Sequence, residues 1–207
     1  MTRSLPASLT ASTGIDALCH AVESYISILA NPLSQVFSKA AIEKICANLE
    51  KAWKDGSDLE ARQNLLEGAF LAGVCLTSSS TVAVHALSYP LGGKYHIPHG
   101  VSNAILLEAV MRVNLPDCQE AFTELAPLML SDCGNIPKEK WPEAVVDYMG
   151  GLCRRLQIPD SLRTFGIESD ALEELTDNAL EVKRLLLKNP RKLTREEIRG
   201  IYEGLLQ

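Results

Sequence analysis

The residues of this chain best suited to chemistry are one aspartate and three histidines. Asp16 and His20 are four residues apart, so on a helix they project from one face and can bind one ion. His85 and His99 come from a second part of the chain. One carboxylate and three imidazoles suit a divalent transition metal such as Fe²⁺ or Zn²⁺, and not Mg²⁺ or Ca²⁺. Such an ion can polarise a bound alcohol or carbonyl oxygen.

The two residues of the first pair also have structural interpretations. Asp16 lies three residues after Thr13, a plausible N-cap, and could be the acidic partner of that cap. His20 is followed by Glu23 and could be an ordinary helical histidine beside a carboxylate. Taken alone, the pair leaves a cap and a metal site open.

The histidines of the second segment have alternatives as well. His85, in an apolar helix, could be a neutral core histidine bonded to a carbonyl. His99, between a proline and a glycine, could face solvent or be aimed inward by a tight turn. His96, in the same loop, could lie near a substrate or simply be exposed. The residues alone therefore indicate a metal site without excluding these readings.

Almost the whole chain has the apolar periodicity of helices. Plausible helix starts are Thr13, Asn31-Pro32, the S-x-x-E pattern at Ser57 and the similar pattern at Thr194. The expected helices cover residues 14–28, 32–54, 58–77, 82–88, 100–114, 118–130, 139–157, 169–188 and 195–206. Two prolines and a Gly-Gly pair predict a loop over 90–100. No alternating β-branched pattern occurs, so we expect an all-α fold with residues 1–207 as one helical domain.

Composition narrows the classes of protein further. A net charge of −6 and a pI near 5.3 argue against nucleic-acid binding, and basic residues near the C-terminus alternate with glutamates as on a solvated helix. The six cysteines occur singly, without the spacing of a zinc ribbon or a disulfide framework. No apolar stretch approaches the roughly 18 residues of a membrane span. We expect a cytoplasmic protein that does not bind membranes.

Two stretches resemble the iron-containing, or group III, alcohol dehydrogenase family. They are TGIDALCHAVE at 13–23 and HALSYPLGGKYHIPHGVSN at 85–103, and the likeness continues through Asn189-Pro190-Arg191 to Thr194. In that family the matching aspartate and histidines bind the catalytic metal. The resemblance therefore implies these ligands: Asp16, His20, His85 and His99. It also implies the fold of the helical C-terminal half of such enzymes, which dehydroquinate synthases share.

The chain departs from the family in two places. Many members carry a second histidine near the nicotinamide, four positions after the first ligand of the second motif, where this chain has Tyr89. A phenol there could donate a hydrogen bond or relay a proton, so Tyr89 is the candidate catalytic residue. Family members also begin with a Rossmann-like domain, but this sequence contains no G-x-G-x-x-G. Gly92-Gly93-Lys94 lacks the rest of a P-loop.

The resemblance implies the metal-binding half of an NAD- or NADP-dependent alcohol dehydrogenase acting on a small alcohol or aldehyde. The partner would be the N-terminal cofactor domain, and without it we expect metal binding but no turnover. The face that this domain normally covers would expose apolar surface and promote a homo-oligomer. Two other classes stay open: a metal-dependent hydrolase, and a non-catalytic metal-binding or interaction domain.

Overall fold

The computed structural model describes residues 2–207, and these form ten α-helices joined by short 3₁₀ turns and loops. No strand occurs in the described part, so the expected all-α fold is confirmed. The helices are α1 (Ala7–Ile26), α2 (Pro32–Lys54), α3 (Leu59–Ser79), α4 (Ala83–Tyr95), α5 (His99–Asn114), α6 (Gln119–Met129), α7 (Trp141–Arg155), α8 (Leu172–Leu180), α9 (Lys183–Leu186) and α10 (Arg195–Gly204).

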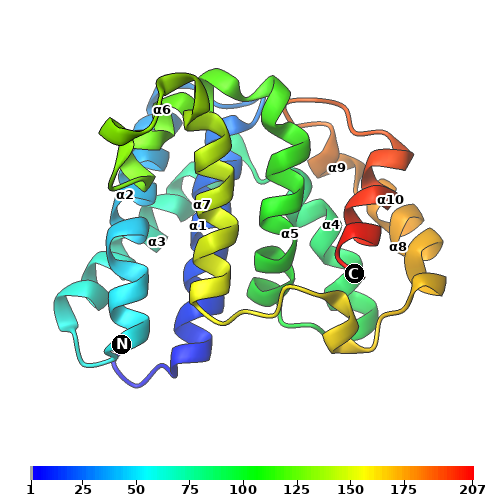
Figure 1. The fold of residues 1–207 in the computed structure, drawn as a ribbon, viewed down its shortest axis with the longest axis horizontal. Coiled ribbons are helices and arrows are strands. Elements are labelled where there is room, and N and C mark those ends of the chain that lie inside the picture. Colours follow the sequence, from blue (N-terminus) through cyan, green and yellow to red (C-terminus); the bar gives the residue numbers. More distant parts are fainter. Residues whose placement is uncertain (1) are drawn as a thin grey trace.

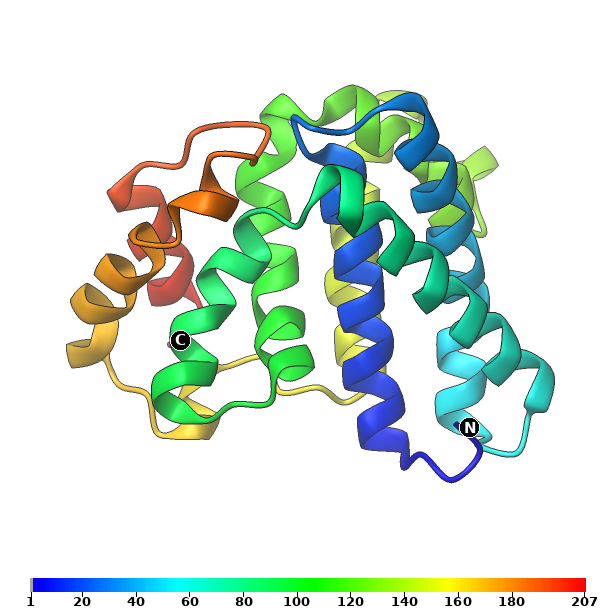
Figure 2. The same cartoon turned by 180° about the vertical axis from the view of Figure 1, so that it is seen from behind.

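Helix α1 lies at the centre of the helical array. It packs against α2, α3 and α5, while α4 packs against α5 and α8. Figure 1 shows α2, α7 and α5 standing roughly side by side, with α8, α9 and α10 gathered at one end. The reverse view in Figure 2 exposes α1 between α3 and the α4–α5 pair. Helix α1 and the consecutive helices α4 and α5, which are distant from it in sequence, therefore meet on this face.

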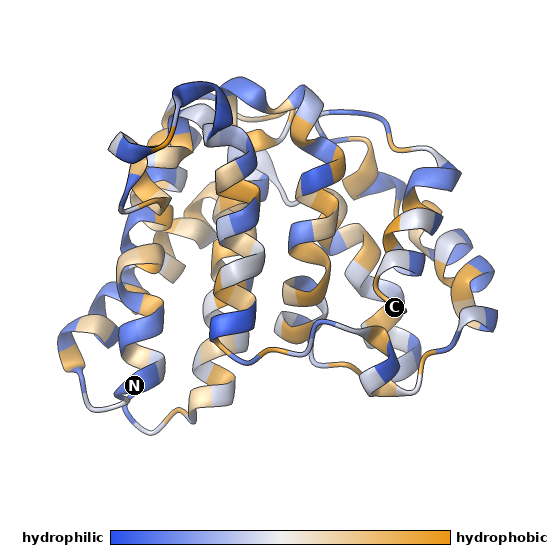
Figure 3. Ribbon diagram, viewed as in Figure 1, coloured by the Kyte–Doolittle hydropathy of each residue, from blue (hydrophilic) through white to orange (hydrophobic). Residues whose placement is uncertain are grey.

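The core is built from the apolar stripes of these helices. Ile15, Leu18 and Val22 of α1 are fully buried, as are Leu87 of α4 and Leu106 of α5. Figure 3 shows the resulting pattern, with apolar and polar residues alternating around each helix. This burial removes apolar surface from water and is the main force that holds α1, α4 and α5 together.

Two expected helix starts are confirmed by their hydrogen bonds. At the start of α2, the Asn31 side chain accepts from the backbone N–H groups of Leu33 and Ser34. At the start of α10, the Thr194 hydroxyl accepts from the Glu197 N–H, and the Glu197 carboxylate accepts from the Thr194 N–H. These contacts satisfy donors that the helix itself leaves free.

The first helix starts earlier than expected, and the prediction of Thr13 as its N-cap was wrong. Helix α1 begins at Ala7. The residues from Ala7 to Ser12 continue the helical periodicity, and three of them, Thr10, Ala11 and Ser12, are buried in the fold. The Thr13 hydroxyl donates to the Leu9 carbonyl instead of accepting from a backbone N–H. Asp16 therefore lies well inside the helix, and its reading as a capping residue is excluded.

Ser57 was also wrong as an N-cap, by one residue. The Asp58 carboxylate accepts from the Ala61 N–H at the start of α3, whereas the Ser57 hydroxyl donates to Asp55. A carboxylate at this position is favoured by the partial positive charge of a helix N-terminus.

The loop expected over 90–100 is mostly helical. Helix α4 continues to Tyr95 with Pro90 inside it, and α5 already begins at His99. Leu87, Pro90 and Leu91 are buried, so tertiary packing outweighs the backbone hydrogen bond that a proline cannot make. His96 takes a left-handed conformation, with φ 55°, where α4 ends.

The single helix expected over 169–188 is divided into α8 and α9. At Val182 the backbone leaves the helical region, with ψ 46°. The turn lets the Lys188 carbonyl accept from the Ile28 N–H, and the Asn189 and Asn114 side chains exchange two hydrogen bonds. Local periodicity does not encode these long-range contacts.

Within residues 2–207 no single helix is long and apolar enough to cross a membrane. Helices α3 and α4 pass that test of length and composition only when taken together, with a bend of 104° between them.

Replacing Thr194 by alanine should lower the free energy of unfolding by about 1 kcal/mol, since it removes an N-cap acceptor. Chemical denaturation of the two proteins measures the difference. Thr13→Ala is the matched control, and it should change stability by less than about 0.5 kcal/mol because Thr13 is exposed inside a helix. Equal losses in both variants would contradict this assignment of caps.

Candidate metal centre

The structure brings the four residues predicted as ligands to one place. Oδ1 of Asp16 lies 3.8 Å from His20 Nε2 and 3.6 Å from Nε2 of both His85 and His99. One side-chain atom of each residue lies within 4.8 Å of the corresponding atoms of the others. The four residues come from α1, α4 and α5, so the site exists only where these three helices meet. Their role as metal ligands stays a prediction.

Each helix contributes through its own geometry. Asp16 and His20 occupy successive turns of one face of α1. The ring of His85 is stacked on that of His20, with centroids 4.8 Å apart. His99 is the first residue of α5, and the glycine after it lets that helix approach α1 closely. A Cβ on Gly100 would lie 2.4 Å from the Ser12 carbonyl oxygen, a contact that only glycine avoids.

The four side chains of the site differ in their exposure to solvent, from buried at one side to exposed at the other. His85 is 3% exposed, whereas the side chains of Asp16 and His20 are 20% and 24% exposed and that of His99 is 47% exposed. A ligand could therefore approach from the His99 side. The buried side is closed by protein.

Burial and charge shift the acidities in this cluster. Burial lowers the pKa of His20 below its usual value. Burial acts on His85 in the same direction, but the carboxylates of Glu23 and Asp16 outweigh it and raise the pKa of that ring to about 9. Burial opposes ionisation of Asp16, yet hydrogen bonds and the nearby imidazoles hold its pKa below the usual value. Asp16 is thus an anion facing three rings.

Two polar residues complete the cluster, and the sequence reading gave neither a role in it. Glu23 was placed beside His20, but its carboxylate lies 2.5 Å from Nδ1 of His85. Asn103 Nδ2 lies 2.6 Å from Asp16 Oδ1 and 3.1 Å from Nε2 of both His85 and His99. Two features of the sequence could have pointed to these residues: Glu23 lies on the apolar face of α1, and Asn103 follows His99 by one helical turn.

The other two side chains considered from the sequence lie differently. Tyr89 is 43% exposed on α4, and its ring centroid is 6.3 Å from that of His99. It therefore borders the open side of the cluster. His96 is exposed and is not among the four residues whose ligand atoms converge.

The donor set fits a divalent transition ion. Ligand atoms about 2.1 Å from a tetrahedral centre lie about 3.4 Å from one another. The Asp16–histidine separations of 3.6 to 3.8 Å are close to that value. Asn103 Nδ2, itself a hydrogen-bond donor, lies against three of the four ligand atoms, so these atoms already surround a point of positive partial charge. Small side-chain movements would adapt the cluster to an ion.

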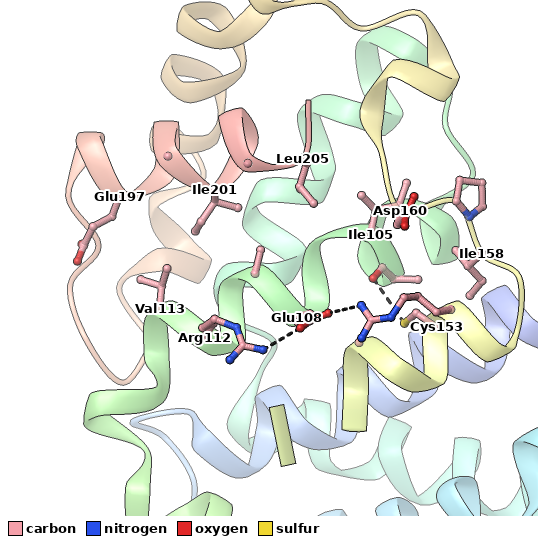
Figure 4. A pocket seen from close by; sticks show the side chains of 17 residues that line it. Ile105, Glu108, Arg112, Val113, Cys153, Ile158, Asp160, Glu197, Ile201 and Leu205 are labelled. Carbon is pink, nitrogen blue, oxygen red and sulfur yellow. Dashed lines mark hydrogen bonds and ion pairs between the residues drawn. The ribbon is translucent and has the colours of Figure 1, made fainter. Parts of the chain in front are cut away.

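A groove of about 600 Å³ lies on another face of α5. Figure 4 shows its lining from α5, α7 and α10, with Arg112 beside Glu108. The Glu108 carboxylate accepts hydrogen bonds from Arg112 and Arg154. Glu108 is nine residues after His99, which puts the two on opposite sides of the helix. The charged groups around Glu108 are already paired, so this groove does not resemble the cluster chemically.

Comparison with known proteins agrees with this geometry. Residues 10–206 match the sequence model of the C-terminal part of the Fe-containing alcohol dehydrogenase family, and the chain belongs to that family. It is 40% identical to long-chain-alcohol dehydrogenase 1 of Geobacillus thermodenitrificans over 99% of its length and 52% of that protein. It is 38% identical to 1,3-propanediol dehydrogenase of Klebsiella pneumoniae over 95% of its length and 51% of that protein.

The fold is similar to solved structures as well. It superposes on a 1,3-propanediol oxidoreductase with a TM-score of 0.94 and 36% identity, over 99% of this chain and 53% of that one. The chain therefore spans about half the length of the relatives it matches. These relatives are alcohol dehydrogenases or oxidoreductases by name, so the family is one of oxidoreductases.

Replacing Gly100 by alanine should push α5 away from α1, because the added Cβ would collide with the Ser12 backbone. We expect a loss of about 1–3 kcal/mol in unfolding free energy, together with weaker metal binding as His99 is displaced. Denaturation and calorimetric titration with Zn²⁺ measure the two effects. In the control Gly93→Ala the new Cβ meets nothing within 4 Å, so neither quantity should fall. Wild-type behaviour of both variants would argue against a close-packing constraint at Gly100.

Proposed function

We propose that this chain supplies the metal-binding half of an NAD(P)-dependent alcohol dehydrogenase. The observation that carries the proposal is the convergence of one carboxylate and three imidazoles from α1, α4 and α5. Membership of the Fe-containing alcohol dehydrogenase family supports the same reaction class. Asp16, His20, His85 and His99 would hold one Fe²⁺ or Zn²⁺ ion.

The protein residues would divide the work of holding the ion. The three neutral rings would donate nitrogen lone pairs, and the Asp16 carboxylate would reduce the net charge and improve retention of the cation. When bound, the ion supplies Lewis acidity that polarises an alcohol or carbonyl oxygen for hydride exchange with a nicotinamide. The open side of the cluster at His99 leaves access for that oxygen.

Tyr89 would act at the rim of this opening. Its exposed phenol lies on the same side as His99, with the ring centroids 6.3 Å apart. A hydroxyl there can donate a hydrogen bond to a substrate oxygen or pass a proton to water. Tyr89 is therefore the candidate proton donor from this half of the enzyme.

The cofactor, NAD or NADP, would be bound by the other half that the relatives possess. That half would also complete the substrate pocket and cover the open side of the cluster at His99 and Tyr89. The substrate would be a small alcohol or aldehyde, in keeping with the name of 1,3-propanediol dehydrogenase, whereas the name of long-chain-alcohol dehydrogenase 1 specifies longer alcohols for that relative.

The first test is the metal content of the protein purified without added metal. We expect about one equivalent of iron or zinc in the wild type and almost none in the double variant Asp16→Ala/His85→Ala. Titration should show a loss of affinity greater than the roughly 10- to 100-fold typical of a lost supporting contact. His96→Ala is the control and should bind as the wild type does. If the three proteins have the same metal content, the four residues are not the ligands, and the chain would be a non-catalytic interaction domain.

The second test is activity. We expect residues 1–207 loaded with Fe²⁺ to show no NAD(P)-linked alcohol oxidation, and to gain it when supplied with the N-terminal half of a relative. Nicotinamide absorbance follows the reaction. Ester and phosphoester substrates are assayed in parallel, and metal-dependent hydrolysis would favour a hydrolase. Robust alcohol oxidation by residues 1–207 alone would contradict the division of labour between the halves.

A further inference from the structure

We propose that Glu23 is a positioning residue that selects which nitrogen of His85 faces the metal. By holding the Nδ1 proton, Glu23 leaves the Nε2 lone pair directed at the other three ligands. This inference rests on the proposed metal site. Glu23 is not one of the four ligands. Its proposed role is to fix which nitrogen of the His85 ring carries the proton, and this affects the affinity for the metal.

The contacts of Glu23 define its state. The side chain is fully buried, its Oε1 accepts the Val84 N–H at 2.6 Å, and its Oε2 lies 2.5 Å from His85 Nδ1. An ionised carboxylate only accepts hydrogen bonds, so Nδ1 must carry the proton. In the neutral ring the other nitrogen is then unprotonated and free to bind a cation.

A contact at the opposite end of the ring is compatible with the same tautomer. Asn103 Nδ2 lies 3.1 Å from His85 Nε2. The same nitrogen is 2.6 Å from Asp16 Oδ1, which identifies it as the amide donor because an amide oxygen would repel the carboxylate. The NH₂ group has two protons, one for Asp16 Oδ1 and one for a ring nitrogen, and a lone pair on His85 Nε2 makes that nitrogen an acceptor for the second. The contacts of Glu23 and Asn103 are thus compatible with one arrangement of the ring.

The backbone contact fixes the orientation of Glu23. Val84 lies in the first turn of α4, where backbone N–H groups have no partner within the helix. The preceding Val82, at the N-cap, has no side-chain oxygen to accept from them. Glu23 of α1 fills this role from a neighbouring helix, which locks its carboxylate between the α4 backbone and the His85 ring.

This anchoring makes Glu23→Gln a sharp test. The glutamine oxygen must still face the Val84 N–H. If the amide were turned, its NH₂ group would face the Val84 N–H, and both groups are hydrogen-bond donors. Its NH₂ group then faces His85 Nδ1, which must become the acceptor. The proton of the neutral ring moves to Nε2, where it blocks the lone pair required by the ion. The change is nearly isosteric, so the helices should stay in place.

We expect Glu23→Gln to weaken Zn²⁺ binding about 10- to 100-fold, as is typical when the support of a metal-binding histidine is lost. Calorimetric titration measures the affinity, and circular dichroism and thermal unfolding of the metal-free protein verify the fold. Glu43→Gln, an exposed change of the same charge on α2, is the control and should leave the affinity unchanged. Wild-type affinity in a folded Glu23→Gln variant would overturn the proposal.

A second readout does not depend on metal binding or on the variant folding. The chain has four histidines, so ¹⁵N-histidine NMR can resolve each ring. In the metal-free wild type, at a pH where the NMR signals show the His85 ring to be neutral, His85 should carry its proton on Nδ1. A proton on Nε2 would refute the assignment. If this tautomer is found but the wild type binds no divalent ion, the proposed function fails and the role of Glu23 in orienting the ring stands.

Discussion

A single carboxylate, Asp16, faces imidazoles from three helices, and the candidate metal centre depends on this meeting point. A partly buried anion is costly unless donors or cations surround it. Here Asn103 on α5 donates a hydrogen bond to Asp16, and the rings of His20, His85 and His99 lie against its carboxylate. The same contacts that compensate Asp16 also assemble the donor set for a cation. Packing and chemistry are therefore coupled at one point.

The close packing of backbones around this point limits which residues can surround it. Gly100 permits contact between α5 and the Ser12 carbonyl, and Glu23 joins α1 to the first turn of α4. Both residues act at helix–helix contacts, and both determine where a histidine ring points. This explains how four side chains from distant parts of the chain converge on a surface otherwise shaped by apolar packing.

The sequence was sufficient to predict the helical class and the convergence of the four residues. Apolar periodicity revealed most helices, and the double motif indicated which histidines to group with Asp16. The same reasoning failed where tertiary contacts outweigh local rules. The burial of Leu87 and Leu91 stabilises α4 on both sides of Pro90, so the helix continues past the proline. The separation of α8 from α9 goes with the long-range hydrogen bonds of Lys188 and Asn189. Glu23 could be seen in the sequence, but its partner could not, because His85 is 62 residues away.

The most direct test of the metal centre is a crystal structure with anomalous scattering measured at the Zn or Fe absorption edge. The account predicts one strong peak about 2.0–2.2 Å from Asp16 Oδ1 and from Nε2 of the three histidines. Glu23 should remain bonded to His85 Nδ1. A peak bound elsewhere, or a metal-soaked crystal in which these side chains contact only each other and water, would contradict it.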